Sequence, residues 1–297
     1  MIELLIPQRR RSLGGGLEVG RVLPYAKRRM VGPFVFFDHM GPVDFAPGVP
    51  REMDVRPHPH IGLSTVTYLL AGEMMHRDSV GSEMSIRPAE VNWMTAGRGI
   101  THSERFEKAR REGDSLHGLQ AWVALPTEFE ETEPAFSHHE GADLPQWQDA
   151  GVHGRLIAGS AYGLTAGVKT HSPLFYVHLD LAAGASAELP SGHSERALYL
   201  VSGAVELEGT RYEPGQMIVV APGASRIKAV EPATVMLLGG EPVGPRFLFW
   251  NFVSSSQERL EQAKEDWKAG RMKLPDLDNQ EFIPLPEEPA PQPNPMS

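Results

Sequence analysis

The sequence TYLLAG at residues 67–72 recurs as LYLVSG at residues 198–203, 131 positions further along the chain. Both copies are runs of apolar, aromatic and β-branched residues that end at a glycine, which is typical of a strand followed by a turn. PAEV at 88–91 and PGQM at 214–217 match at an offset of 126, because the first copy has a longer hairpin. A strand-turn-strand unit that recurs in this way predicts two β-domains of similar design.

Short apolar segments separated by glycine and proline dominate the chain before residue 254, and helical periodicity is almost absent there. The expected strands are 33–37, 63–70, 83–87, 91–95, 119–125, 174–181, 197–201, 217–220 and 234–238. Many short strands with turn signals between them are typical of a sandwich or barrel. Together with the repeat, they predict an all-β fold of two stacked β-barrels.

The pattern changes near the C-terminus. Residues 255–258 (SSQE) resemble a capping box, which marks the start of a helix. Apolar residues follow at helical spacing, at Leu260, Ala263 and Trp267, and Gly270 is a helix stop. The sequence therefore predicts one amphipathic helix that lies on a barrel.

Three domain ranges follow from these patterns. Residues 1–135 are expected to form an N-terminal metal-binding barrel, and residues 136–253 a C-terminal barrel without a metal site. Residues 254–297 are expected to hold the helix and a proline-rich tail. From Pro284 onward the density of proline predicts an extended or disordered segment.

Two short motifs carry the candidate chemistry, His58-Pro59-His60 and His102-Ser103-Glu104. In each motif the potential ligands are two residues apart, so on a strand they point to the same face. If the two strands lie close together inside a barrel, three imidazoles and one carboxylate converge on one point. That set suits one divalent transition metal with a position left open for substrate or water.

The repeat is an internal control on this metal proposal. At the offsets above, the counterparts of the four candidate ligands are Leu189, Ser191, Lys228 and Val230. These residues do not make a divalent-metal set, so the second barrel is expected to lack the site. The alternative is that the nearby His193 and Glu195 act there as shifted ligands.

Composition narrows the function classes. The 297-residue chain carries a net charge of −10, which argues against a general affinity for nucleic acid. Basic clusters at 9–11 and 27–29 are interpreted as solvated edges. There is no cysteine, so disulfides and thiolate metal sites are excluded. No apolar run is long enough for a membrane span, and a cytoplasmic location is expected.

The first half of the chain resembles the pirin family of the cupin superfamily. The matching segments are GPFVFFDHMGP at 32–42, PHPH at 57–60, TYLLAG at 67–72, HRDS at 76–79 and WMTAGRGITHSE at 93–104. The resemblance implies a bicupin fold with a metal, typically iron, held by His58, His60, His102 and Glu104. It also implies either quercetin 2,3-dioxygenase activity or a regulatory role through protein contacts. One departure is that Leu63 and Ser64 stand where many members have a glutamate.

Two functions stay open at this point. The first is a dioxygenase that acts on flavonol-like aromatic compounds with dioxygen. Fe(II) is favoured by the resemblance, although the ligand set also accommodates Mn, Co, Ni, Cu or Zn. The residues alone support Glu104 as a ligand, and the resemblance implies that it is also the catalytic proton acceptor. The alternative is a metal-binding regulator of a partner enzyme or transcription complex. A monomer without direct contact to nucleic acid or membrane is expected in both cases.

Several further residues have two interpretations. His76 is interpreted as an exposed hairpin histidine that could instead line the mouth of the pocket, and His138 and His139 as solvent-facing groups in an acidic linker. An apolar group could form an entrance for a flat substrate or be ordinary barrel packing; it comprises Phe36, Phe37, Met40, Trp93 and Met94.

Overall fold

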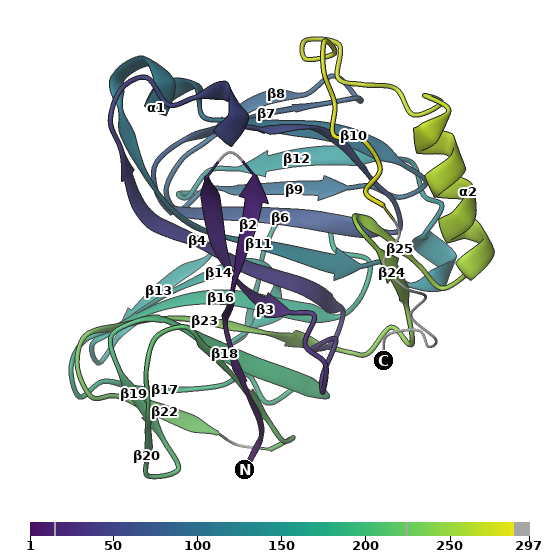
Figure 1. Cartoon of the computed structure of the whole chain (residues 1–297). Helices are drawn as coiled ribbons and strands as arrows, with labels where there is room; N and C mark the ends of the chain where they lie inside the picture. Colours follow the sequence, from purple (N-terminus) through teal and green to yellow (C-terminus); the bar gives the residue numbers. More distant parts are fainter. Residues whose placement is uncertain (15, 224, 288–297) are drawn as a thin grey trace. The chain divides into compact units, whose positions relative to one another are not determined.

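The structure is a computed structural model that describes residues 1–14, 16–223 and 225–287. The predicted all-β class with a C-terminal helix is confirmed (Figure 1). The chain forms two compact units: residues 1–10, 20–37 and 139–243 make the first, and residues 11–19, 38–138 and 244–297 the second. These units are interleaved in sequence. The domain ranges 1–135, 136–253 and 254–297 expected above stay a prediction.

The first unit contains an eight-stranded and a four-stranded antiparallel sheet. The larger sheet has the order β1 (Ile2–Pro7), β21 (Gln216–Val220), β18 (Glu195–Ser202), β23 (Ala233–Gly240), β16 (Leu174–Leu181), β14 (Val152–Ala161) and β13 (Gln146–Asp149), with β15 (Leu164–Thr165) paired to β14. The smaller sheet has the order β17 (Ser186–Glu188), β22 (Arg226–Ala229), β19 (Val205–Leu207) and β20 (Thr210–Tyr212). Strand β1 belongs here because Ile2–Pro7 pair with Gln216–Val220.

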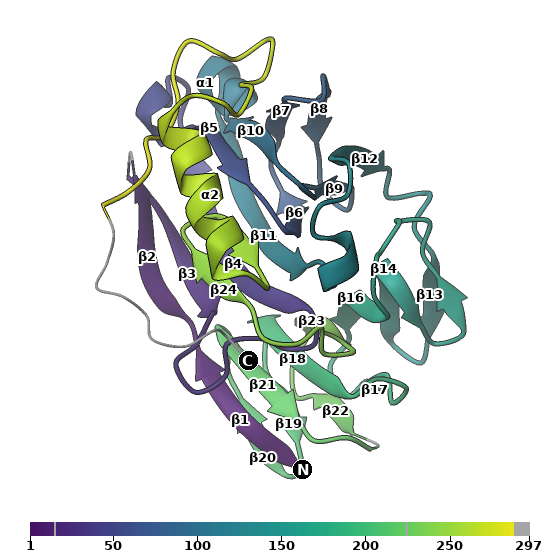
Figure 2. The same ribbon diagram turned by 90° about the vertical axis from the view of Figure 1, so that its right-hand side faces the viewer.

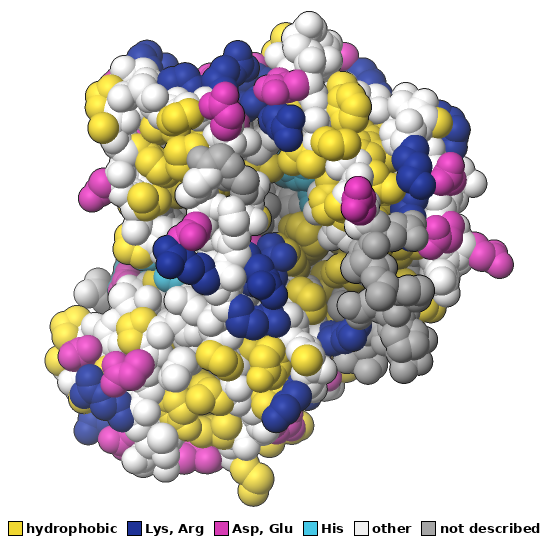
Figure 3. All heavy atoms as spheres, viewed as in Figure 1, with side chains coloured by type: hydrophobic (Ala, Val, Ile, Leu, Met, Phe, Trp, Pro, Cys, Tyr) yellow, Lys and Arg dark blue, Asp and Glu magenta, His cyan; other side chains and the backbone are white. Residues whose placement is uncertain are grey.

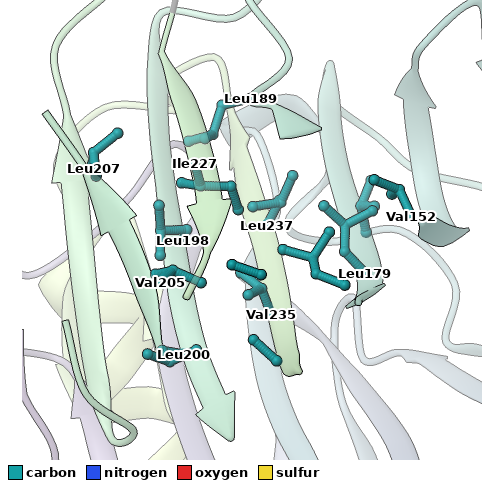
Figure 4. Close-up of a cluster of buried hydrophobic side chains, with 14 of the residues drawn as sticks. Val152, Leu179, Leu189, Leu198, Leu200, Val205, Leu207, Ile227, Val235 and Leu237 are labelled. Atoms are coloured by element: carbon teal, nitrogen blue, oxygen red, sulfur yellow. The ribbon is translucent and has the colours of Figure 1, made fainter. Parts of the chain in front are cut away.

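The interior of this unit is filled with aliphatic side chains. Leu179, Leu198, Val205, Ile227 and Leu237 come from five different strands and point toward one another in Figure 4. All five are fully buried. The cluster is almost entirely aliphatic, so it offers a ligand no charged or imidazole side chain.

The second unit contains a four-stranded sheet, β5 (Val55–His60), β10 (Ile100–Arg105), β7 (Met74–Asp78) and β8 (Glu83–Ile86). A seven-stranded sheet has the order β12 (Ala135–His139), β9 (Val91–Thr95), β6 (Leu63–Ala71), β11 (Asp114–Ala124), β4 (Phe34–Phe45), β3 (Leu17–Leu23) and β2 (Arg9–Gly14). Most of its residues belong to the second unit, whereas residues 9–10, 20–23, 34–37 and 139 belong to the first. The remaining elements are β24 (Phe247–Phe249), β25 (Phe252–Ser254), α1 (Glu107–Glu112), α2 (Gln257–Lys268) and 3₁₀ turns at Arg51–Met53 and Thr127–Phe129.

Strand pairing confirms the repeat in its central part. Thr67 pairs with Asn92 and Gln120, whereas Leu198, its counterpart at offset 131, pairs with Ile218 and Leu237. The Asn92–Ile218 match has the predicted offset of 126. The two domains therefore share one strand order at these positions, but different residue types occupy it.

The counterparts predicted for the first histidine pair are wrong by three residues. His58 pairs with His102, and in the other unit Lys228 pairs with Ser186. Ser186 and Glu188 are therefore the counterparts of His58 and His60, in place of Leu189 and Ser191. The loop before β18 is longer than the loop before β6, and this length difference shifts the offset.

Helix α2 begins one residue later than the capping-box interpretation implies. Ser256 is the N-cap, and its Oγ accepts the backbone N–H of Arg259. The segment after α2 folds back over β10 (yellow in Figures 1 and 2). Residues 284–287 have no regular secondary structure, and Leu285 packs against the α2 cluster. The rest of the predicted tail, residues 288–297, lies outside the described residues.

The surface carries charges of both signs. Figure 3 shows Lys and Arg side chains next to Asp and Glu side chains at several points of one face. No helix in the described part of the chain is long and apolar enough to cross a bilayer.

Candidate metal centre

Three histidines converge on the neighbouring strands β5 and β10 of the second unit. His58 faces His102 in the antiparallel register, and His60 lies two residues further along β5, on the same face. The ring centroids lie 4.3 Å apart for His58 and His102, 5.0 Å for His58 and His60, and 5.1 Å for His60 and His102. One donor nitrogen from each ring lies within 4.8 Å of the other two. All three side chains are buried.

These rings present the lone pairs that a metal needs. His58 Nδ1 donates to the carbonyl oxygen of Arg56 at 2.9 Å, which leaves its Nε2 lone pair free. Both ring nitrogens of His60 and Nε2 of His102 are buried without a hydrogen-bond partner. Buried polar atoms rarely stay unpartnered in folded proteins. A bound cation would take one nitrogen of each ring, so it would satisfy Nε2 of His102 and one of the two His60 nitrogens.

The protonation states agree with metal binding. Burial lowers the pKa of His58 to about 4. Burial, together with the neighbouring imidazoles, lowers the pKa values of His60 and His102 well below 6.5. The three rings are therefore neutral near pH 7, which is the form of imidazole that coordinates divalent metals. The donor set fits one such ion.

A fourth histidine lies directly behind His102. The expectation that His76 is an exposed hairpin residue is wrong: it is 5% exposed and lies on β7, which pairs with β10. Its Nδ1 lies 3.3 Å from Nδ1 of His102, and its Nε2 lies 3.0 Å from Oδ2 of Asp78. Strand alternation explains the correction, because His76 and Asp78 point inward while Arg77 points out to Glu83.

Glu104 is held at one side of the three-histidine group. Its oxygens are not among the donor atoms that lie within 4.8 Å of one another. Gln120 Nε2 donates to Glu104 Oε1 at 3.4 Å, and Thr67 Oγ1 donates to Gln120 Oε1 at 2.7 Å. Burial raises the pKa of Glu104 to about 7. Its role as fourth ligand stays a prediction.

The polar row formed by Glu104, Gln120 and Thr67 continues across the sheet. Asn92 pairs with Thr67 in the strand register, and its Oδ1 lies 2.8 Å from Nδ1 of His138. His138 Nε2 in turn lies 3.7 Å from a carboxylate oxygen of Glu90. The expectation that His138 is a solvent-facing linker residue is therefore wrong. It lies on β12, whose partner strand β9 carries Asn92.

Two aromatic rings flank the histidines. Trp122 lies edge-on to His60, with centroids 5.1 Å apart. Phe136 stacks on His76 at 4.4 Å with an interplanar angle of 16°. The site therefore combines a neutral imidazole cluster, a polar row that starts at Glu104, and apolar ring surfaces. Such a combination is typical of small-molecule sites.

Comparison with known proteins identifies the family. Residues 16–123 match the pirin family model, and residues 176–273 match the model of the pirin C-terminal cupin domain. A pirin-like protein of Caulobacter vibrioides is 63% identical over 289 residues, which cover 97% of this chain and 100% of that protein. The chain belongs to the pirin family.

Other relatives of this pirin carry enzyme names. A candidate quercetin 2,3-dioxygenase of Pseudomonas aeruginosa is 38% identical over 96% of this chain and 90% of that protein. The crystal structure of a quercetin 2,3-dioxygenase from Acinetobacter baumannii is similar with a TM-score of 0.89 and 33% identity, over 98% of this chain and 97% of that chain. The two family matches and this structure together cover both of the expected cupin domains.

The C-terminal cupin domain of this pirin has no matching site among its described residues. Ser186 and Lys228 occupy the places of His58 and His102. Glu188, in the place of His60, is exposed and pairs with Arg226 at 3.2 Å. Across residues 1–14, 16–223 and 225–287, the one group of three or more ligand-type residues with metal-site spacing is His58, His60 and His102.

The alternative ligands proposed for that domain do not form a site either. Glu195 pairs with Arg28 at 2.9 Å and accepts the backbone N–H of Gly32. His193 lies with Nε2 3.3 Å from the carbonyl oxygen of Ser160. The two side chains therefore serve separate contacts.

Most of the apolar entrance group is ordinary packing. Phe37 packs on Tyr199 at 5.0 Å, and the guanidinium of Arg21 lies over the ring of Phe36. Met40 belongs to a separate buried cluster with Leu69. Met94 is different, because it packs with Phe136, which reaches the site. Trp93, which is also buried, lies one position along β9 and so points to the opposite face from Met94.

Sequence reasoning gave His76 a place at the pocket mouth only as the alternative interpretation, and it missed Thr67, Gln120, Trp122 and Phe136. A signal existed for His76, since His76 and Asp78 repeat the i, i+2 spacing of the two ligand motifs. The other four become visible only through strand pairing. Gln120, for example, meets Thr67 across β6 and β11 although 53 residues separate them in sequence.

Proposed function

We propose that this pirin is a metal-dependent dioxygenase of the quercetin 2,3-dioxygenase type, which acts on flavonol-like aromatic compounds. The observation that carries the proposal is the group of three neutral, buried histidines with free lone pairs beside a carboxylate of raised pKa. The names of the two enzyme-like relatives support the same reaction class. His58, His60 and His102 would hold the metal, with Glu104 as the fourth ligand.

Glu104 is assigned the role of proton acceptor. In the metal-free protein its pKa of about 7 lies near the operating pH, and a bound cation would lower that pKa and keep the carboxylate ionised, which is the form that accepts a proton. When bound, a divalent metal supplies a Lewis acid that lowers the pKa of a hydroxyl group coordinated to it. Glu104 would take the proton of the substrate's 3-hydroxyl, and Gln120 would orient the carboxylate through its Nε2–H.

Trp122 and Phe136 are assigned to the aromatic part of the substrate. Their rings lie next to His60 and His76, respectively, so a flat molecule that reaches the histidines meets apolar surface on its way. Aromatic side chains bind flat rings by offset or edge-to-face contacts. Burial of the substrate between them would also exclude water from the reacting atoms.

The metal is proposed to be one Fe(II) per chain, on the strength of the family resemblance; Mn, Co, Ni, Cu and Zn satisfy the same ligands. We further propose that the active form is a monomer and that the substrate is a small molecule. The alternative of a metal-binding regulator needs the same ligands, so substrate turnover separates the two functions.

The test is dioxygen uptake with quercetin. Metal-free protein reloaded separately with Fe(II), Mn, Co, Ni or Cu is expected to consume dioxygen and quercetin together with at least one of these metals. The His60→Ala variant treated identically is the control and should show the background rate. Stoichiometric metal binding without any dioxygen uptake would contradict the dioxygenase and favour the regulatory alternative.

A further inference from the structure

The outer face of strand β10 is tied to the C-terminal segment. His102 and Glu104 point inward, so Ser103 and Arg105 point to the opposite face. There, Asp278 accepts hydrogen bonds from Arg105 Nε and Nη2, both at 2.7 Å, and from Ser103 Oγ at 2.6 Å. A two-pronged pair of this kind fixes direction as well as distance.

Arg105 is the centre of this contact. Its side chain is 2% exposed, and it also meets Asp54 at 3.4 Å and Glu281 at 3.0 Å. A buried guanidinium depends on its carboxylates, because an unpaired charge in the interior is strongly unfavourable. Arg105 therefore requires Asp278 and Glu281 to stay docked.

The same segment also holds the other ligand strand. The backbone N–H of Ile283 donates to the carbonyl oxygen of Pro57 at 2.8 Å, next to His58 on β5. The Ile283 carbonyl oxygen in turn accepts Nε1–H of Trp267 at 3.0 Å, which anchors the segment on α2. Nearer to α2, Thr101 Oγ1 donates to the carbonyl oxygen of Lys273.

These contacts fall on the immediate neighbours of the ligands. Pro57 precedes His58, and Thr101 and Ser103 flank His102. A displacement of residues 273–283 would therefore release both ligand strands at the residues that set the positions of the imidazoles. A pair of ligands on two strands keeps its spacing only while the strands keep their register.

We infer that residues 273–283, here called the C-terminal clamp, position the ligand strands β5 and β10 and are coupled to metal binding. Asp278 and Arg105 are positioning residues in this account. The inference rests on the proposed metal site. Coupling is reciprocal: if a docked clamp favours metal binding, a bound metal favours the docked clamp by the same free energy. The docking of the clamp at the protein surface would therefore change with metal occupancy.

The test compares Asp278→Asn with Asp276→Asn. Asp276 is the matched control, because it lies on the same segment but pairs only with exposed Lys273. Co²⁺ is the probe, and its release to a chelator is followed by absorbance. Release from Asp278→Asn is expected to be on the order of 10-fold faster than from wild type, the size typical for residues that orient metal ligands. Asp276→Asn should release Co²⁺ at the wild-type rate.

Hydrogen exchange of residues 273–283 in the wild-type protein gives a second measurement that needs no variant. Exchange in the clamp is expected to slow on Co²⁺ loading, more than in the hairpin 205–212 of the other cupin domain. Equal clamp exchange with and without bound Co²⁺, or unchanged Co²⁺ release from Asp278→Asn, would overturn the coupling while leaving the metal site intact. Failure of wild-type protein to bind Co²⁺ would overturn both this inference and the proposed metal site.

Discussion

The Nδ1 atoms of His102 and His76 lie 3.3 Å apart, at the end of a chain that begins at Asp78. The Asp78 carboxylate accepts the proton of His76 Nε2, and we assign His76 the tautomer with a lone pair at Nδ1. His102 must then carry its proton on Nδ1 and direct its free Nε2 lone pair toward His58 and His60. Asp78 itself is held by the backbone N–H groups of Val80 and Ser82.

Asp78→Asn should weaken metal binding on the order of 10- to 100-fold, the range for residues that orient a ligand histidine. The amide can no longer act as an acceptor-only partner, so the proton positions along His76 and His102 lose their definition. Metal affinity is measured by competition with a chelator. Glu83→Gln, at the end of the same hairpin, is the control and should bind like wild type. An unchanged affinity in Asp78→Asn would refute the tautomer assignment.

Glu104→Gln should lower metal retention less than removal of a histidine, yet abolish dioxygenase turnover. The amide oxygen can still coordinate, but it carries no charge and accepts no proton near neutral pH. Metal content and dioxygen uptake are measured on the same sample, with Glu83→Gln as the control carboxylate. Full turnover by metal-loaded Glu104→Gln would rule out the base role.

The metal-free protein should lose stability as the pH falls from about 6.5 toward 4. In this window unfolded histidines bind protons, whereas burial keeps the pKa of folded His58 at about 4 and those of His60 and His102 low. Glu104 acts in the opposite direction, because its folded pKa of about 7 keeps it protonated while the unfolded residue ionises. Together, the three histidines change the free energy of unfolding with pH more than the single carboxylate does, so the net effect of acidification is a loss of stability.

The urea midpoint of chelator-treated protein is therefore expected to be lower at pH 5.5 than at pH 7.5. His60→Leu, which removes one of the depressed histidines, should show a smaller difference between the two pH values. A midpoint that rises on acidification, or a pH dependence that His60→Leu leaves unchanged, would contradict the assigned charge states.

Deletion of the residues after Ile283 should leave metal content intact. Leu285 is the contact of residues 284–287 with the α2 cluster, while the bonds of Ile283 to Pro57 and Trp267 are kept. The expected cost is about 1 kcal/mol, which lowers Tm by roughly 2–4 °C. Truncation after Met272, which removes the clamp, should cost much more. Equal melting temperatures for the two truncations would contradict this division of roles.

Sequence patterns predicted those strands whose signal is local. Strands Val91–Thr95 and Leu174–Leu181 match the expected ranges at both ends, because each is a compact β-rich run between turn residues. Strand β1 was not predicted, since its stability comes from pairing with residues 216–220 at the far end of the chain. Local sequence does not encode the partner of such a strand.

The candidate site likewise contains residues that local sequence patterns placed and residues that depend on strand pairing. The i, i+2 spacing was sufficient to place His58 and His60 on the same face, because strand alternation is a local rule. The meeting of His102 with the other two also needed the two strands to lie close together, which the pairing of β5 with β10 confirms. The spacing did not place Glu104, since the β5–β10 register shifts between His102 and Glu104. Gln120 then meets the carboxylate from a different strand.

The most direct test of the central claim is the metal content of the protein, measured by elemental analysis after reloading. One equivalent per chain is expected for wild type and little or none for the His58→Ala/His102→Ala double variant, because the three-histidine group occurs in the N-terminal cupin domain. Two equivalents in wild type, or one equivalent retained by the double variant, would contradict the account.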